Sequence, residues 1–270
     1  MIRLASPEDL PALRELFARA NDVPYDLTVV TEEKCFGDGI AGKPVTRVIE
    51  QDGRLIAAAV RCGKWLRLIA VHPEERRKGY GTALIDGECA VVAAEPGNYF
   101  VPGVPVEDEG AKAFFLANGF SEGATTWNLE VGVEKVETNE DVRRPERSEA
   151  ERVLEFVERE FGRIWRFEAA KAFEREVPPA FIAEEEGTIT GFAVHDVNNR
   201  GLGWFGPTGV AKEMRGRGVG GRLLLASLAD LRRLGYERAI IPWTDALDFY
   251  ARASGAKPAH QFVAFARTRP

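Results

Sequence analysis

The chain has 270 residues, of which 45% are hydrophobic and 29% charged, and this composition excludes an intrinsically disordered protein while leaving room for two average domains. Its formal charge of −6 at pH 7 excludes an overall positive field that would attract nucleic acid or an anionic membrane. Because no apolar run approaches the roughly 18 residues that span a bilayer, and no signal peptide is recognisable, we expect a cytoplasmic protein.

Cysteine and histidine are scarce. The three cysteines, Cys35, Cys62 and Cys89, are an odd number and too few for a disulfide scaffold, which fits a reducing compartment. The chain has no C-x-x-C or H-E-x-x-H pattern, and its three histidines lie far apart in the sequence. We therefore expect a bacterial cytoplasmic protein with no metal.

The first predicted element is a helix that begins at residue 7. Ser6 is a suitable N-cap, Pro7 suits the first helical position, and apolar residues then recur at helical spacing as far as Phe17. A β-hairpin follows, because Asp52-Gly53 separates two runs of residues that favour strands.

A strand, a basic loop with glycines, and a helix are predicted next. The apolar run 66–71 predicts a buried strand, which leads through Pro73 into Arg76-Arg77-Lys78-Gly79-Tyr80-Gly81 and then into a helix from Thr82. The first half closes with a helical segment at 113–120 that contains Phe114-Phe115.

The same signals return in the same order in the second half. Ser148-Glu149-Ala150-Glu151 predicts a capping box and a helix, and a hairpin is predicted around Gly187. The three glutamates before Gly187 are either an acidic trap for a cationic substrate or a solvated hairpin tip, which we favour. Residues 133–146 are expected to carry one sheet's end across to the next.

The second basic loop follows the predicted strand 204–210. It reads Arg215-Gly216-Arg217-Gly218-Val219-Gly220 and begins 139 residues after the first loop, at the same distance from a closing valine. Glycines let backbone N–H groups approach a ligand, and the helix start adds a positive dipole, so such a loop suits a pyrophosphate. Neither copy has the Gly-Lys-Ser/Thr of a Walker loop or the spacing of a dinucleotide fingerprint.

These two loops resemble the acyl-CoA pyrophosphate loop of the GNAT N-acetyltransferase superfamily. The segments 113–120 and 248–256 also resemble the Phe-Tyr ending of that family's last helix. The resemblance implies a mixed α/β fold with two tandem GNAT domains, 1–133 and 134–270, and acetyl-CoA as co-substrate. It implies an N-acetyltransferase that moves the acetyl group to a primary amine of a small molecule, by direct attack in a ternary complex.

The residues that the resemblance assigns to CoA belong to the two loops and their flanks: Val71, Arg76, Arg77, Lys78, Gly79, Tyr80, Gly81 and Thr82 in the first half, and Val210, Arg215, Gly216, Arg217, Gly218, Val219, Gly220 and Gly221 in the second.

The catalytic acid differs between the halves. In the family the tyrosine of Phe-Tyr protonates the departing CoA thiolate, and the matching residue here is Tyr250. The first half has Phe115 at this position, which cannot donate a proton. We therefore expect turnover in the C-terminal half and a catalytically degenerate, acyl-CoA-binding or structural N-terminal half.

Other positions depart from the family pattern. The proline after the first strand, Pro73, is Lys212 in the second copy, and an asparagine common in the family is replaced by Asp108 and Trp243. Ser254 is an extra residue before the closing glycine. The identity of the acceptor amine therefore cannot be inferred from any particular relative.

The general base has no clear candidate. Strand 204–210 contains no acidic residue, so His195 or Asp196 on the preceding strand, or a water relay, could take the proton from the amine. A second group of residues could wall an acceptor pocket or simply pack in the core: Trp165, Phe167, Phe173 and Trp243.

Two other functions remain open from the sequence. Phe115 and the missing base are also compatible with an acyl-CoA-binding or regulatory protein that turns over little substrate. A protein N-acetyltransferase is a third possibility, because an acidic surface suits a basic peptide. The sequence does not give the acyl-chain preference or the oligomeric state.

Overall fold

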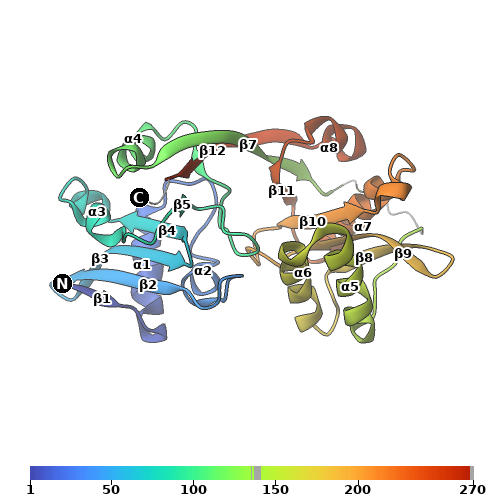
Figure 1. Ribbon diagram of the computed structural model, residues 1–270, viewed down its shortest axis with the longest axis horizontal. Helices are drawn as coiled ribbons and strands as arrows, with labels where there is room; N and C mark the ends of the chain where they lie inside the picture. The colour runs from blue at the N-terminus through green and yellow to red at the C-terminus, as the bar shows by residue number, and fades with distance from the viewer. Residues whose placement is uncertain (135, 137–140, 268–270) are drawn as a thin grey trace. The chain divides into compact units, whose positions relative to one another are not determined.

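The computed structural model describes residues 1–134, 136 and 141–267. The chain forms two compact units: unit 1 is Met1–Thr126 together with His260–Pro270, and unit 2 is Trp127–Ala259. Each unit combines a β-sheet with helices, as expected for an α/β chain (Figure 1). In the described part of the chain, no helix is both long and apolar enough to cross a membrane.

Unit 1 is built on a mixed sheet whose strands follow the order β1-β2-β3-β4-β5-β12-β7. Its strands are β1 (Ile2–Leu4), β2 (Val45–Gln51), β3 (Arg54–Cys62), β4 (Trp65–Val71), β5 (Val91–Val92), β6 (Val104–Pro105), the first half of β7 (Ser121–Gly132) and most of β12 (Lys257–Ala266). Its helices are α1 (Leu10–Ala20), α2 (Thr31–Phe36), α3 (Tyr80–Leu84) and α4 (Glu109–Ala117), with 3-10 turns at Pro7–Asp9 and Pro73–Glu75.

The first helix and the first hairpin form where the sequence predicts them. Ser6 and Asp9 make a reciprocal capping box, Pro7 occupies the first turn, and α1 buries Leu13, Leu16 and Phe17. Asp52 and Gly53 both have positive φ, at 52° and 75°, as a two-residue hairpin turn requires.

The last strand of the chain lies in unit 1. β12 pairs antiparallel with β5 through Phe265 and Ala266 and with β6 through Phe262 and Val263. Phe262 and Phe265 are fully buried. In Figure 1, the red strand β12 accordingly lies beside β7 and β5, within the sheet of the blue and green half.

The compact units therefore differ from a simple division of the chain at residue 133. The strand that ends the second sequence repeat completes the sheet of unit 1. The second half of β7 in turn pairs with β11 inside unit 2, from Trp127 opposite Thr244 to Gly132 opposite Arg238. The expected connection at 133–146 lies partly outside the described residues.

Unit 2 contains the three-stranded antiparallel sheet β10-β9-β8 and the pair β7–β11. Its strands are β8 (Ala180–Glu185), β9 (Thr188–His195), β10 (Phe205–Val210) and β11 (Arg238–Thr244). Its helices are α5 (Ala150–Phe161), α6 (Arg163–Ala170), α7 (Val219–Arg233) and α8 (Leu247–Ser254), with 3-10 turns at Arg147–Glu149, Lys171–Glu174 and Lys212–Met214.

Both faces of the β8–β9 hairpin are buried. Ile182, Phe192 and Val194 belong to a core cluster with α5 and α6, whereas Phe181 and Ala193 belong to a cluster with α7. This alternation is the two-residue period of a strand that is covered on both sides.

The second capping box begins two residues earlier than predicted. Glu146 and Glu149 form the box, whereas Ser148 lies within the 3-10 turn that precedes α5. The hairpin turn is Glu186–Gly187, with φ of 50° and 75°. Glu184 accepts ion-pair hydrogen bonds from Arg143 and Arg152 at 2.6 Å, which supports the interpretation of this acidic run as a hairpin end.

Candidate functional site

In unit 1 the central strand β4 separates from its parallel neighbour. β4 pairs with β5 at Trp65 opposite Val91 and Leu66 opposite Val92, and the Ala93 N–H donates to the Leu66 carbonyl at 2.8 Å. On its other edge β4 stays paired with β3 as far as Val71. The two parallel strands therefore form a fork that opens after Leu66.

A bulge turns the backbone of β4 toward this fork. The pairing register with β3 shifts between Leu66 and Leu68. The Leu66 carbonyl points to β5, yet the His72 N–H, an even number of residues later, donates to Ile56 of β3 at 2.8 Å. Since backbone groups alternate along a strand, the bulge leaves the N–H groups of Ile69 and Val71 directed into the open gap.

A pocket of about 650 Å³ occupies this gap. Strand β4, the first basic loop, α4 and the segment after β5 contribute to its wall. Of the loop residues that the sequence assigns to CoA, the pocket is lined by Val71, Arg76, Arg77, Gly79, Tyr80, Gly81 and Thr82. Lys78 pairs instead with Glu75 at 2.9 Å.

The first basic loop is fixed to the end of β4. Arg76 Nε donates to the Val71 carbonyl at 3.2 Å, and Arg76 Nη2 pairs with Asp22 at 2.6 Å. Gly79 has φ of 86° and caps α3, while Arg77 holds the left-handed conformation at φ 65°. This cap leaves the first N–H groups of α3 without carbonyl partners in the helix, so they face the loop.

The second basic loop repeats this geometry in unit 2. Arg215 Nε donates to the Val210 carbonyl at 3.2 Å. Gly216 has φ of 79°, at the place where the first loop has Arg77, and Gly218 caps α7 with φ of 77°. Because α7 has 15 residues and α3 has five, the N-terminus of α7 carries the fuller helix dipole. Val219 is buried in the core, so its backbone N–H, not its side chain, faces the loop.

The last glycine of each loop has a packing role. A Cβ on Gly81 would lie 3.0 Å from the Phe114 ring, and a Cβ on Gly220 would lie 3.3 Å from the Phe249 ring. Neither residue has a positive φ. These glycines let the last helix approach the loop helix closely, so the family-like Phe of the last helix and the loop glycine form one contact.

The central strand of unit 2 also carries a fork and a bulge. The Ile240 N–H of β11 donates to the Gly203 carbonyl at 2.9 Å, and Trp204 forms a parallel bridge with Ile240. The register with β9 then shifts between Phe205 and Thr208. By the same alternation, the N–H groups of Thr208 and Val210 are directed away from β9.

Tyr250 lies near the start of this strand. Its ring contacts Phe205 edge-on at 6.3 Å, and burial raises the pKa of its hydroxyl to about 12. In unit 1, Phe115 lines the pocket and packs against Phe120 and Phe265, each at 5.7 Å between ring centroids. The two residues therefore occupy corresponding places on the last helix of each repeat, one with a hydroxyl and one without.

The two candidate bases lie in polar networks of unit 2. His195 is fully buried and its Nε2 contacts the Asp230 carboxylate at 2.8 Å, while Arg144 pairs with the same carboxylate at 2.6 Å. Burial lowers the pKa of His195, and His195 together with Arg144 keeps the pKa of Asp230 below its usual range despite desolvation. These contacts favour a structural role for His195.

Asp196 is similarly occupied. Its carboxylate accepts from Arg175 at 2.9 Å, from the Tyr236 hydroxyl at 2.8 Å and from the Gly201 N–H at 2.9 Å. Both oxygens of this carboxylate are therefore engaged within unit 2, which favours a structural role for Asp196.

The aromatic residues considered for an acceptor wall separate into two groups. Trp165 stacks on Phe161 at 5.1 Å and packs against a core cluster that contains Phe173. Phe167 contacts Lys171, whereas Trp243 is 44% exposed and donates its backbone N–H to Asn128 at 2.9 Å.

Asp108, which stands where the family often has an asparagine, caps α4. Its Oδ1 accepts from the Ala111 N–H at 2.9 Å, which is the bond that an asparagine would also make.

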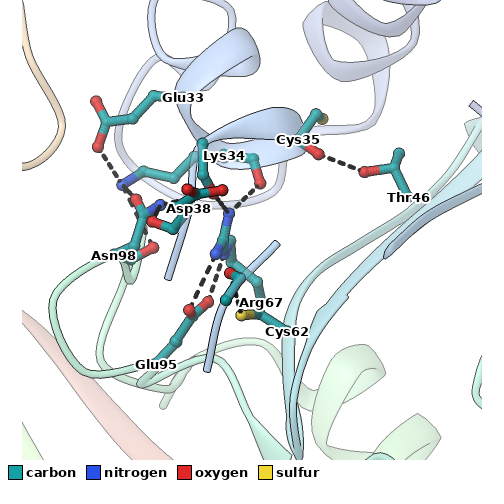
Figure 2. Close-up of polar contacts among 11 residues, drawn as sticks. Glu33, Lys34, Cys35, Asp38, Thr46, Cys62, Arg67, Glu95 and Asn98 are labelled. Carbon is teal, nitrogen blue, oxygen red and sulfur yellow. Dashed lines mark hydrogen bonds and ion pairs between the residues drawn. The ribbon is translucent and has the colours of Figure 1, made fainter. Parts of the chain in front are cut away.

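A buried charged cluster next to the pocket of unit 1 was missed from the sequence. Figure 2 shows the Arg67 guanidinium against the Glu95 carboxylate, with Arg67 Nη1 donating to the carbonyl oxygens of Lys34 at 2.8 Å and Gly37 at 2.9 Å. Lys34 is fully buried and donates to Asn98 Oδ1 at 2.8 Å. Arg67 interrupts an otherwise apolar strand, and this was the signal available in the sequence.

The cluster joins three segments around the fork. Arg67 belongs to β4 at the bulge, Glu95 follows β5, and Lys34 belongs to α2. Within the described residues, no group of three or more His, Cys, Asp or Glu side chains is arranged to hold a metal ion. The three cysteines are free and buried, and burial raises the pKa of the Cys35 and Cys89 thiols to about 12.

Comparison with known families matches both halves of the chain. Residues 25–122 match the acetyltransferase (GNAT) domain, and residues 143–256 match the acetyltransferase (GNAT) family. The chain therefore belongs to the GNAT acetyltransferases and contains two such domains in tandem, which confirms the fold predicted from the two loops. No curated protein matches the sequence.

Solved structures support the same fold. The glucosamine N-acetyltransferase region of a fungal multi-domain GH3 β-N-acetylglucosaminidase superposes with a TM-score of 0.79 at 18% identity, covering 98% of this chain and 38% of that one. A GCN5-related N-acetyltransferase from Sphaerobacter thermophilus superposes with a TM-score of 0.69 at 21% identity, covering 98% of this chain and 94% of that one. For a tandem GNAT protein from the clavulanic acid biosynthesis pathway the TM-score is 0.67 at 17% identity, with 98% of this chain and 97% of that one covered.

Proposed function

We propose that this protein is an acetyl-CoA-dependent N-acetyltransferase that acetylates a primary amine of a small molecule, with turnover in unit 2. The observation that carries the proposal is the combination, in one unit, of a glycine-capped basic loop, a forked central strand and a tyrosine at the fork. Membership of the GNAT acetyltransferases supports acetyl transfer as the reaction class.

The basic loop of unit 2 would hold the pyrophosphate of CoA. The cap at Gly218 directs backbone N–H groups of a 15-residue helix toward the loop, and Arg215 and Arg217 add positive charge. Arg215 is oriented by the Val210 carbonyl through its Nε, which leaves its terminal nitrogens available for phosphate oxygens.

The forked strand would hold the pantetheine arm and the thioester. The N–H groups of Thr208 and Val210 point away from β9, so they can donate to the amide groups of the arm or to the thioester oxygen. A fixed backbone donor near the carbonyl stabilises the negative charge that develops when the amine attacks. With both substrates bound side by side, no covalent enzyme intermediate is required.

Tyr250 would protonate the departing CoA thiolate. Its raised pKa, about 12, keeps the hydroxyl protonated through the neutral range, as a general acid requires. The incoming amine, with a pKa near 10.4 in water, must lose a proton before it attacks. Because His195 and Asp196 are held in other contacts, we assign this proton to a water relay.

Unit 1 would bind acyl-CoA without turning it over. Its loop and pocket have the same layout, but Phe115 stands at the position of Tyr250 and cannot donate a proton. This feature also supports a second candidate for unit 1 alone, a regulatory site that senses acyl-CoA.

Tyr250→Phe tests the proposal. We expect the purified chain to release free CoA thiol from acetyl-CoA when a panel of small amines is offered, and we expect the variant to release it roughly 100-fold more slowly. Phe115→Tyr serves as a control, because it adds a hydroxyl at the matching position of unit 1. Absence of amine-dependent release from the unaltered chain, with CoA binding intact by calorimetry, would favour an acyl-CoA-binding protein.

A further inference from the structure

We propose that the pocket of unit 1 is a binding site for an acyl-CoA whose acyl group is apolar and longer than acetyl, and that it holds this group without transferring it. The proposal rests on the proposed function in one respect, because it takes the first basic loop as the site of the CoA pyrophosphate. The observations below concern the side chains that line the pocket and the charged groups beside it.

Apolar side chains from outside the basic loop form part of the pocket wall. These are Leu27, from the connection between α1 and α2, Phe100 and Val101, from the segment after β5, and Val104 of β6. All four belong to the buried core, with exposed fractions of 5% or less. Such a wall gains affinity from each methylene it removes from water, roughly fourfold per group.

The acidic side chains around this pocket are already paired. Glu95, buried beside the fork, presents its two carboxylate oxygens to Arg67 (Figure 2). Asp22 pairs with Arg76 at 2.6 Å and Glu75 with Lys78 at 2.9 Å. A cationic amine entering here would lose its hydration without meeting an uncommitted carboxylate, which is unfavourable.

Asp108, the other acidic residue of the wall, is committed as well. Its Oδ1 accepts from the Ala111 N–H at 2.9 Å and caps α4. The pocket therefore suits an uncharged apolar group better than an amine acceptor.

The pocket also lacks an acid for the leaving thiolate. Phe115 lines it at the position of Tyr250. Tyr80, the tyrosine of the wall, belongs to the loop, and its hydroxyl is directed to Gln51 at 3.4 Å. A bound thioester would therefore persist.

The arrangement of the cluster fixes the pocket's shape. Arg67 holds the end of α2 through the carbonyls of Lys34 and Gly37, and it holds the segment after β5 through Glu95. These are the segments that carry or flank Leu27, Phe100 and Val101. The buried ion pair thus positions the apolar wall. Arg67 also lines the pocket, and its guanidinium is held there by Glu95 and by the two carbonyls.

Calorimetry on a chain with only the first loop intact tests the proposal. Arg215→Glu/Arg217→Glu places negative charge in the second loop and leaves unit 1 unchanged. We expect this variant to bind one equivalent of hexanoyl-CoA at least tenfold more tightly than acetyl-CoA. We also expect it to release no thiol from hexanoyl-CoA when amines are added.

Val101→Phe narrows the pocket in the same background. We expect it to reduce the preference for hexanoyl-CoA to threefold or less while acetyl-CoA binding persists. Val60→Phe, at a buried valine of β3 outside the pocket, is the matched control and should keep the preference. Thermal unfolding reports whether each variant folds, and Leu27→Phe replaces Val101→Phe if that variant does not.

The outcomes separate this proposal from the proposed function. Equal affinities for acetyl-CoA and hexanoyl-CoA would overturn the apolar acyl site and leave CoA binding by unit 1 intact. Thiol release from hexanoyl-CoA by the second-loop variant would overturn retention without transfer. If neither thioester nor free CoA binds to this variant, the assignment of the first loop to CoA fails instead.

Discussion

Arg76 Nε donates to the carbonyl oxygen of Val71 at 3.2 Å, which ties the basic loop of unit 1 to the end of its central strand. Arg215 and Val210 make the same bond at the same distance in unit 2. The carbonyl of the closing valine faces the gap beside the strand, so this bond orients each arginine at the mouth of the gap. The repeated sequence spacing thus corresponds to a repeated three-dimensional contact.

Two glycines of the second loop should respond in opposite directions to alanine. Gly218→Ala places a side chain at φ 77° and should lower the free energy of unfolding by about 1–2 kcal/mol. Gly221→Ala lies inside α7, with its nearest Cβ neighbour at 3.9 Å, and should raise it by about 0.5–1 kcal/mol. Urea denaturation of both variants measures this. A similar loss in both would contradict the assigned backbone strain.

Gly81, the loop glycine that packs on the last helix of the first repeat, should affect CoA binding when it is replaced. In Gly81→Ala the new Cβ would lie 3.0 Å from the Phe114 ring, so the helix must shift. We expect weaker CoA binding in unit 1, by roughly tenfold, because the loop N–H groups move with α3. In the double variant Gly81→Ala/Phe114→Leu, the smaller leucine side chain makes room for the new Cβ and should restore most of the affinity for CoA. Failure of this rescue would show that the contact does not set the loop geometry.

The last strand should be required for unit 1. Phe265 is fully buried in β12 and contacts Phe115 of the pocket wall. Phe265→Ala should therefore lower the free energy of unfolding by about 3–5 kcal/mol and impair binding at the first loop. Phe249→Ala, at an exposed phenylalanine of α8 that contacts Gly220, is a control expected to affect the second loop instead. Unchanged CoA binding by unit 1 in Phe265→Ala would contradict the role of β12.

Tyr250 should contribute to alkaline sensitivity of the fold. Its pKa is raised from 10.0 to about 12, so the native state keeps the proton while the unfolded chain releases it. Its contribution to the free energy of unfolding, about 2–3 kcal/mol, is present below pH 10 and is lost as the pH rises toward 12. Denaturation of the unaltered chain and of Tyr250→Phe at pH 9 to 12 measures the difference. Parallel pH profiles would show that the hydroxyl is solvated.

His195 should contribute on the acid side. Burial lowers its pKa below 6.5 in the native state, so the unfolded chain binds a proton that the native chain resists. Stability from this group is present above pH 6.5 and falls as the pH drops below that value. We expect His195→Gln to have a shallower loss of stability between pH 6.5 and 5, measured by urea denaturation. A steeper loss would contradict the buried neutral histidine.

The sequence predicted those parts of the fold that local patterns encode. Ser6 and Pro7 mark a helix start, Asp52-Gly53 and Glu186-Gly187 mark hairpins, and the loops around Arg76 and Arg215 are where the spacing predicts them. Each of these signals depends on residues a few positions apart. The same holds for Phe114 and Phe249, although their contact with the loop glycines became visible only in three dimensions.

Features that depend on distant partners could not be predicted. The pairing of Phe265 with Val92 joins strands that are far apart in the sequence, and β12 reads locally as the end of the second repeat. Arg67 was expected only as a member of an apolar strand, because its partner Glu95 is 28 residues away. The commitment of His195 to Asp230 likewise depends on the packing of α7 against β9.

The stoichiometry of CoA binding by calorimetry tests the central claim, that the two basic loops each hold a CoA pyrophosphate. We predict two equivalents for the unaltered chain and one for either Arg76→Glu/Arg77→Glu or Arg215→Glu/Arg217→Glu. No CoA binding by the unaltered chain, or a stoichiometry that neither double substitution changes, would contradict the account.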